Sequence, residues 1–220
     1  MTSVPVARPP RRDHGSGRPS AVRTPLRTPP DVSWNMAHNA DTAPRSTVVA
    51  LVGAYSDELL TGLADVPALV ALSLREAQPA VAAHLVASVS MPYVVHDADP
   101  LEHVAAAWVE LFEERSTLGA LEAEVEAVLV RFDEGSALMP DYYIVLEPQG
   151  APDTWRHWWC GALGHHAPQR VLASPAPTTP QDAAIRRLLS NLPSSRPWPD
   201  PASWLPHLPF ESPDRVGLRD

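Results

Sequence analysis

Residues 141–147 read Asp-Tyr-Tyr-Ile-Val-Leu-Glu, and this stretch decides the fold that the sequence predicts. The run is rich in aromatic and β-branched side chains, which are favoured in strands. It also alternates, because Tyr142, Ile144 and Leu146 fall on one side of an extended chain and their neighbours on the other. A period of two over such residues predicts a β-strand.

Two later segments favour strands as well. Residues 155–163 are rich in tryptophan, and residues 169–173 follow after a turn that contains Gly164 and Pro168. A turn of this kind between two extended runs is typical of a hairpin. We therefore expect a small antiparallel sheet over residues 141–174.

The chain before this sheet shows mainly the period of a helix, and residues 46–134 are expected to form a helical half. The apolar spacing predicts a helix over 46–63, a second after Asp65, and a third that is opened by Pro79 with Val81, Leu85 and Val89 on its apolar side. A short extended piece is expected over 92–95. Two further helices, broken at 115–119, are expected to form an αα-hairpin.

The clearest helix start is the run Asp99-Pro100-Leu101-Glu102. It places an N-cap, a proline at the first helical position and an early glutamate in the order that helix N-termini favour. With His96 and Asp97 it also resembles a pair of carboxylates beside a histidine, which is a catalytic arrangement. Because capping already explains Asp99, we expect a structural role for it.

The resulting prediction is an α+β fold in a single acidic domain, residues 46–220. Its helical half packs on the small antiparallel sheet, a helix follows over 180–192, and an irregular segment rich in tryptophan and proline, 193–220, covers the sheet. Residues 1–45 contain few large apolar side chains and many prolines, so we expect a disordered tail rich in arginine and proline.

Charge separates the tail from the domain. The tail carries seven arginines and three aspartates, 7 − 3 = +4, whereas residues 46–220 carry ten basic and 23 acidic side chains, 10 − 23 = −13. An acidic body repels phosphates, so we expect no nucleic acid partner. All 17 basic residues are arginine, as in a chain encoded by a GC-rich bacterial genome.

The compartment is predicted from cysteine content and hydropathy. The single cysteine, Cys160, allows no intramolecular disulfide, and no apolar run approaches the roughly 20 residues that span a membrane. We therefore expect a cytoplasmic protein that does not bind membranes.

Tryptophans form the first candidate site. Five of the seven lie in the second half of the chain, and each either is buried or belongs to an aromatic patch that binds a ligand or another protein: Trp155, Trp158, Trp159, Trp198 and Trp204. We favour burial, with the C-terminal segment packed over the sheet.

The only dense cluster of cysteine and histidine consists of His157, Cys160, His165 and His166. It matches no standard zinc spacing, and on a regular strand His157 and Cys160 point to opposite faces. Cys160 with a neighbouring histidine is also a candidate nucleophile and base, although no flanking signature supports it.

The chain contains no G-x-S-x-G motif, P-loop or glycine-rich dinucleotide fingerprint. No cofactor is expected. The sequence favours a non-enzymatic interaction or regulatory protein, with another protein as the expected partner. The alternative is an enzyme or metal-binding protein centred on residues 157–166, and the oligomeric state stays open.

Overall fold

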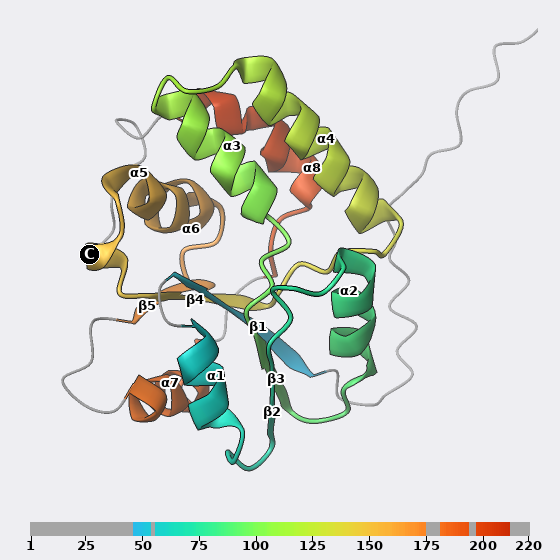
Figure 1. The fold of residues 1–220 in the computed structure, drawn as a ribbon, viewed down its shortest axis with the longest axis vertical. Coiled ribbons are helices and arrows are strands. Elements are labelled where there is room, and N and C mark those ends of the chain that lie inside the picture. The colour runs from blue at the N-terminus through green and yellow to red at the C-terminus, as the bar shows by residue number, and fades with distance from the viewer. Residues whose placement is uncertain (1–45, 54–55, 175–180, 194–196, 212–220) are drawn as a thin grey trace, which may run out of the picture. The chain divides into compact units, whose positions relative to one another are not determined.

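A sheet of five parallel strands organises the structure, which is a computed structural model. The strands are β1 (Thr47–Gly53), β2 (Leu69–Leu72), β3 (Tyr93–His96), β4 (Tyr142–Leu146) and β5 (Val171–Ser174). They lie in the order β2-β3-β1-β4-β5, so the first strand is central (Figure 1). Because all five run in one direction, the loops that follow them meet at the same edge of the sheet.

The structure describes residues 46–53, 56–174, 181–193 and 197–211, all within the compact unit Ala43–Asp220. The tail expected over residues 1–45 lies outside the described residues. Within the described part of the chain, no helix is both long and apolar enough to cross a bilayer.

The expected antiparallel sheet and α+β class are wrong, because the parallel sheet makes this an α/β fold. The helix predicted over 46–63 is strand β1 followed by α1 (Ser56–Leu63), and the helix predicted after Asp65 contains strand β2. Both errors have one cause. A strand that is covered on both faces is apolar throughout, as Thr47–Gly53 is, and so it loses the alternation that identifies a strand.

The strand predicted over 155–163 is also wrong. This segment is α5 (Asp153–Arg156), a π-helical turn (His157–Leu163) and α6 (Gly164–His166). Strands β4 and β5 are parallel neighbours, so a tight hairpin cannot join them, and the helical segment provides the crossover that they require.

The predicted positions of several other helices and strands are confirmed. Strands β3, β4 and β5 lie where extended segments were expected. The expected helical hairpin is α3 (Glu102–Phe112) and α4 (Leu118–Asp133), and the helix expected over 180–192 is α7 (Gln181–Ser190). Thr117 caps α4 by accepting the Ala120 N–H at 3.3 Å.

Helices cover both faces of the sheet (Figure 1). Helices α1 and α7 pack on one face, in a core with Leu51 and Ile144. The opposite face, which includes Ala50 and Tyr143, carries α3, α4, the crossover segment and the C-terminal elements α8 (Pro201–Trp204) and a 3₁₀ turn (Leu205–Phe210).

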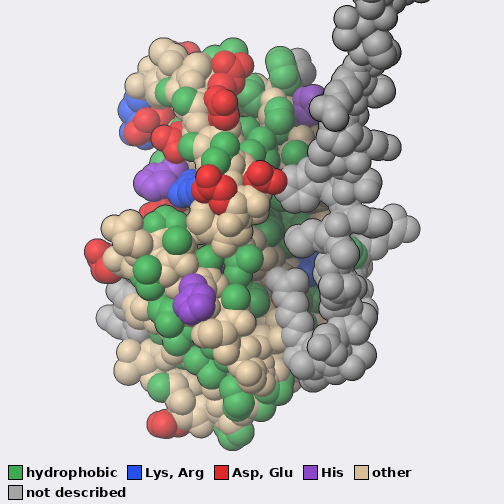
Figure 2. Space-filling model, turned by 90° about the vertical axis from the view of Figure 1, so that its right-hand side faces the viewer, with side chains coloured by type: hydrophobic (Ala, Val, Ile, Leu, Met, Phe, Trp, Pro, Cys, Tyr) green, Lys and Arg blue, Asp and Glu red, His purple; other side chains and the backbone are tan. Residues whose placement is uncertain are grey.

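Helix α2 (Pro79–Ser88) packs beside them with an unexpected side inward. Its buried residues are Ala82, Ala83 and Val86, whereas Val81 and Leu85 of the predicted apolar stripe are 51% and 40% exposed. The helix is apolar all round, so its sequence does not specify one inward side. Figure 2 shows hydrophobic side chains over α2 and acidic ones above them, over α4.

Candidate functional site at the carboxyl edge of the sheet

A pocket of about 560 Å³ lies where β1 and β4 end, and we call it the outer pocket. The chain leaves β1 toward β2 through α1, and it leaves β4 toward β5 through α5 on the opposite face. Two neighbouring parallel strands whose connections diverge in this way open a crevice between their carboxyl ends, which is where ligands bind in sheets of this kind.

Backbone geometry shapes the floor of the outer pocket. Gly53 ends β1 with a φ of +103°, and a Cβ built there would lie 2.6 Å from the carbonyl oxygen of Leu146 in β4. Glu147, the next residue after β4, has a φ of +48°, which is uncommon for a side chain of this type. Left-handed non-glycine residues store strain and cluster at functional sites.

The charges around the outer pocket are mostly negative. Its described lining holds four carboxylates and one guanidinium, from Asp97, Asp99, Glu102, Glu147 and Arg75. The guanidinium of Arg75 donates a hydrogen bond of 3.1 Å to Ser56 Oγ at the start of α1. The pocket therefore has a negative potential near neutral pH.

Asp97 has a structural role at the carboxyl edge of the sheet. Its Oδ1 accepts the backbone N–H groups of Leu74 and Arg75 at 2.6 and 3.1 Å, and its Oδ2 accepts the Ser73 hydroxyl at 3.2 Å. These bonds hold the loop after β2 against the loop after β3. Asp97 thereby fixes where Arg75 enters the pocket wall.

Asp99 joins the loop after β3 to strand β4 and to the turn before α3. Its Oδ1 accepts the Leu101 N–H at 2.8 Å and the Tyr143 hydroxyl at 2.9 Å. The N-cap of α3 is Leu101 and no side chain caps the helix, so the prediction that Asp99 is the N-cap is wrong, and its bond to Leu101 instead orders the turn before α3. Burial raises the pKa of Asp99 to about 6, although both hydrogen bonds oppose that shift. Burial and the neighbouring Asp99 charge raise the pKa of Tyr143 as well.

His96 closes β3 beneath helix α2 and is 5% exposed. Burial lowers the pKa of His96 to about 4, although the charge of Asp97 and the backbone of Ala98 act to raise it. The imidazole is therefore neutral near pH 7. No described residue forms a hydrogen bond with its buried Nδ1.

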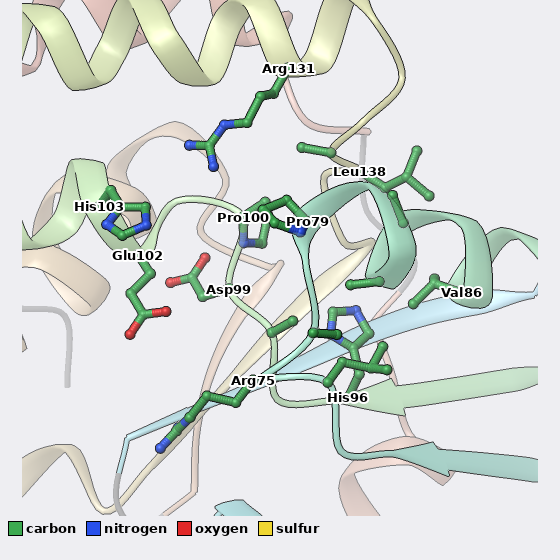
Figure 3. Close-up of a pocket in the computed structure, with 16 residues that line it drawn as sticks. Arg75, Pro79, Val86, His96, Asp99, Pro100, Glu102, His103, Arg131 and Leu138 are labelled. Atoms are coloured by element: carbon green, nitrogen blue, oxygen red, sulfur yellow. The ribbon is translucent and has the colours of Figure 1, made fainter.

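A second cavity, of about 180 Å³, lies on the other side of Asp99, and we call it the inner cavity. Figure 3 shows it between α2, the Asp99–Pro100 loop and Arg131 of α4. Arg75, Asp99 and Glu102 border both spaces.

The five candidate tryptophans fall into two environments. Trp155 and Trp159 lie one helical turn apart, with ring centroids at 5.3 Å, and both line the outer pocket. Both also belong to the hydrophobic core or pack against it, as do the other three, which do not line the outer pocket: Trp158 contacts Trp108, Trp204 is 3% exposed, and Trp198 donates to the Pro140 carbonyl at 2.9 Å. The crossover helix thus brings only Trp155 and Trp159 to a candidate site.

The histidine and cysteine candidates lie on the same crossover but have separate surroundings. His166 pairs with Glu211 at 2.9 Å and stacks on Trp204 at 4.4 Å, whereas His165 is exposed. Burial raises the pKa of the Cys160 thiol, which disfavours the nucleophilic thiolate. Among the described residues, no three His, Cys, Asp or Glu side chains form a group that could hold a metal ion.

Four of the charged residues that border the two pockets were missed as site residues by sequence reasoning. Arg75, Glu102, Arg131 and Glu147 lie on four separate segments, and no motif links them. A usable signal did exist, because Asp97 and Glu147 directly follow buried strands. That signal has meaning only once the strands are known to be parallel.

No protein-family model, curated protein or solved structure matches this chain. Function is therefore inferred from the site itself and not from the fold.

Proposed function

We propose that this chain is a non-enzymatic interaction module whose outer pocket receives a positively charged side chain of a protein partner. The observation that carries the proposal is the excess of carboxylates over cations in a pocket at the divergence of β1 and β4. A guanidinium or ammonium group entering this space meets a favourable potential, because the four carboxylates of the lining outnumber its one guanidinium, that of Arg75.

The aromatic wall favours the same ligand. Trp155 and Trp159 line the same outer pocket as Glu147 and Glu102. A cation over a tryptophan face gains roughly 0.5–2 kcal/mol, and the aliphatic stem of arginine or lysine covers the ring surface. The carboxylates therefore suit the charged group of a basic side chain, and the tryptophan rings suit its aliphatic stem.

The exposed opening of the outer pocket favours a ligand that is a side chain of another protein. Glu102, Gly150 and Pro152 are exposed where the pocket opens, so a backbone can pass across the mouth while one side chain enters. The acidic domain as a whole, at a formal net charge of −13 from 10 − 23, adds attraction for a basic partner surface.

An acid–base enzyme at this edge has less support. Asp97 is occupied by three hydrogen bonds, Asp99 by two, and His96 has a pKa near 4, far from the value that suits a general base at neutral pH. The alternative enzyme or metal site at residues 157–166 has no convergent group of ligands in the described chain.

The test compares the peptide Gly-Arg-Gly with Gly-citrulline-Gly, because citrulline has the shape of arginine without its charge. Titration is followed by calorimetry and by tryptophan fluorescence. We expect the arginine peptide to bind at least about tenfold more tightly, a difference of about 1.4 kcal/mol, and to weaken as salt is added. Equal affinity, or no binding at all, would reject the proposal.

Variants then place the peptide in the pocket. Glu147→Gln and Trp155→Ala should each weaken the arginine peptide about three- to tenfold, whereas Glu122→Gln on α4 removes the same charge outside the outer pocket and should change nothing. An effect of Glu122→Gln as large as that of Glu147→Gln would show general charge attraction and no defined site.

A further inference from the structure

The inner cavity has an apolar end. It is formed by Leu74, by Ala82, Ala83 and Val86 of α2, and by Leu138 after α4. Leu74, Ala82, Ala83 and Val86 are buried. A dry cavity of about 150 Å³ accepts a molecule the size of benzene, so a space of about 180 Å³ has room for a short branched hydrocarbon chain.

The other end of the inner cavity carries opposite charges that do not meet. In Figure 3 Arg131 and Asp99 point toward each other from opposite walls. No ion pair within 4 Å joins them, and the buried Nε of Arg131 has no hydrogen-bond partner among the described residues. Asp99 uses Oδ1 for its hydrogen bonds to Leu101 and Tyr143, which leaves Oδ2 available to a ligand.

His96 adds a third polar group to the lining. It is 95% buried, and its Nδ1 has no partner in the described chain. An unpaired buried nitrogen costs free energy that a bound donor or acceptor recovers. Arg131, Asp99 and His96 therefore lie at a polar end of the cavity, which Arg75, Glu102 and His103 also line, and the opposite end is hydrocarbon.

We infer that the inner cavity binds a small α-amino acid with an apolar side chain. The carboxylate of the ligand pairs with Arg131, its ammonium group pairs with Asp99 Oδ2, and its side chain packs against Ala82, Val86 and Leu138. A ligand with one charged end satisfies one wall and leaves the other charge unpaired, whereas a zwitterion satisfies both. This site goes beyond the proposed function, because it lies in a different cavity and takes a different ligand.

The first test uses the full-length wild-type protein and three ligands of similar shape. L-leucine carries both charged groups, 4-methylpentanoate lacks the ammonium group, and isoamylamine lacks the carboxylate. Calorimetry should show leucine binding at least about tenfold more tightly than either analogue. Equal affinities for the three compounds, or no leucine binding in the millimolar range, would overturn the inference without any variant being made.

Variants locate the ligand. Arg131→Gln should weaken leucine at least about tenfold, and Ala83→Leu should block it by filling the apolar end, whereas Arg187→Gln on α7, on the opposite face of the sheet, should bind normally. Leucine binding that survives Ala83→Leu in a folded variant overturns the site.

The two proposals fail separately. The peptide comparison uses Glu147 and Trp155, which do not line the inner cavity, and the amino-acid comparison uses Arg131 and Ala83, which do not line the outer pocket. Loss of leucine binding with intact peptide binding therefore rejects only the inference drawn from the inner cavity.

Discussion

The hydroxyl of Tyr143 donates a 2.9 Å hydrogen bond to Oδ1 of Asp99, and this bond ties the core of β4 to the loop that follows β3. Tyr143 is fully buried, so its hydroxyl has no access to solvent as a replacement partner. The same oxygen of Asp99 accepts the Leu101 N–H at the start of α3. One carboxylate thus fixes a strand, a loop and a helix around both pockets.

Removing Asp99 should cost more than the loss of one hydrogen bond, because its Oδ1 accepts two. Asp99→Ala loses the bond to Leu101, worth about 1 kcal/mol, and leaves the buried Tyr143 hydroxyl unpaired, for a total loss of about 2–4 kcal/mol in the free energy of unfolding. Tyr143→Phe keeps the ring and removes only the donor, so we expect a loss of about 1–2 kcal/mol. Urea denaturation measures both, and an Asp99→Ala variant as stable as wild type would contradict this role.

Stability should depend on pH through Asp99 and His96 in opposite senses. The pKa of Asp99 is raised from 3.8 to about 6, so its stabilising contribution is complete below pH 3.8 and is lost as pH rises through 6. The pKa of His96 is lowered from 6.5 to about 4, so its contribution is complete above pH 6.5 and is lost as pH falls through 4. Between pH 4 and 6 the two effects oppose each other.

Single variants separate these two effects. Asp99→Asn keeps an acceptor for Tyr143 but no longer titrates, so its stability should rise more steeply with pH than that of wild type between pH 4 and 6. His96→Phe should show the reverse, a flatter or falling curve over the same range. Urea midpoints measured across this range test the idea, and curves parallel to wild type would show that neither pKa is shifted.

Gly53 should be essential to the β1–β4 contact. In Gly53→Ala the new Cβ meets the Leu146 carbonyl oxygen at 2.6 Å and the residue must also keep a φ of +103°. We expect a loss of at least about 2 kcal/mol, measured as a shift of the urea midpoint. Gly119→Ala is the matched control, because a Cβ there meets nothing within 4 Å in helix α4 and should stabilise by up to about 1 kcal/mol. Equal effects of the two substitutions would refute the steric explanation.

The C-terminal segment should be a structural cover. Trp204 is 3% exposed, and Trp108 Nε1 donates to the Leu208 carbonyl at 3.2 Å. Trp204→Ala should therefore cost about 3–5 kcal/mol, whereas Phe210→Ala, at a side chain 72% exposed in the same segment, should cost less than about 0.5 kcal/mol. Thermal unfolding distinguishes them. If Trp204→Ala melts like wild type, the segment does not stabilise the domain.

Local sequence signals predicted helices α3 and α4 and strand β4. Helices α3 and α4 have apolar stripes and recognisable starts, and β4 is marked by aromatic and β-branched residues. The same signals failed for β1 and β2, because helices cover both faces of the sheet and the strands need no polar side. They failed again at 155–163, where large aromatic side chains favour strands intrinsically but tertiary packing selects a helix.

The sequence by itself determined the compositional split between the tail and the acidic domain, and the helical hairpin. Only the tertiary structure decided that the strands are parallel, and with that the position of both pockets. The physical reason is that strand direction follows from how the crossover helices pack on the sheet, which no local pattern encodes. Arg75 and Asp99 line both pockets because the loops after β2 and β3 lie at one edge of the sheet, where Arg131 borders the inner cavity and Glu147 the outer pocket.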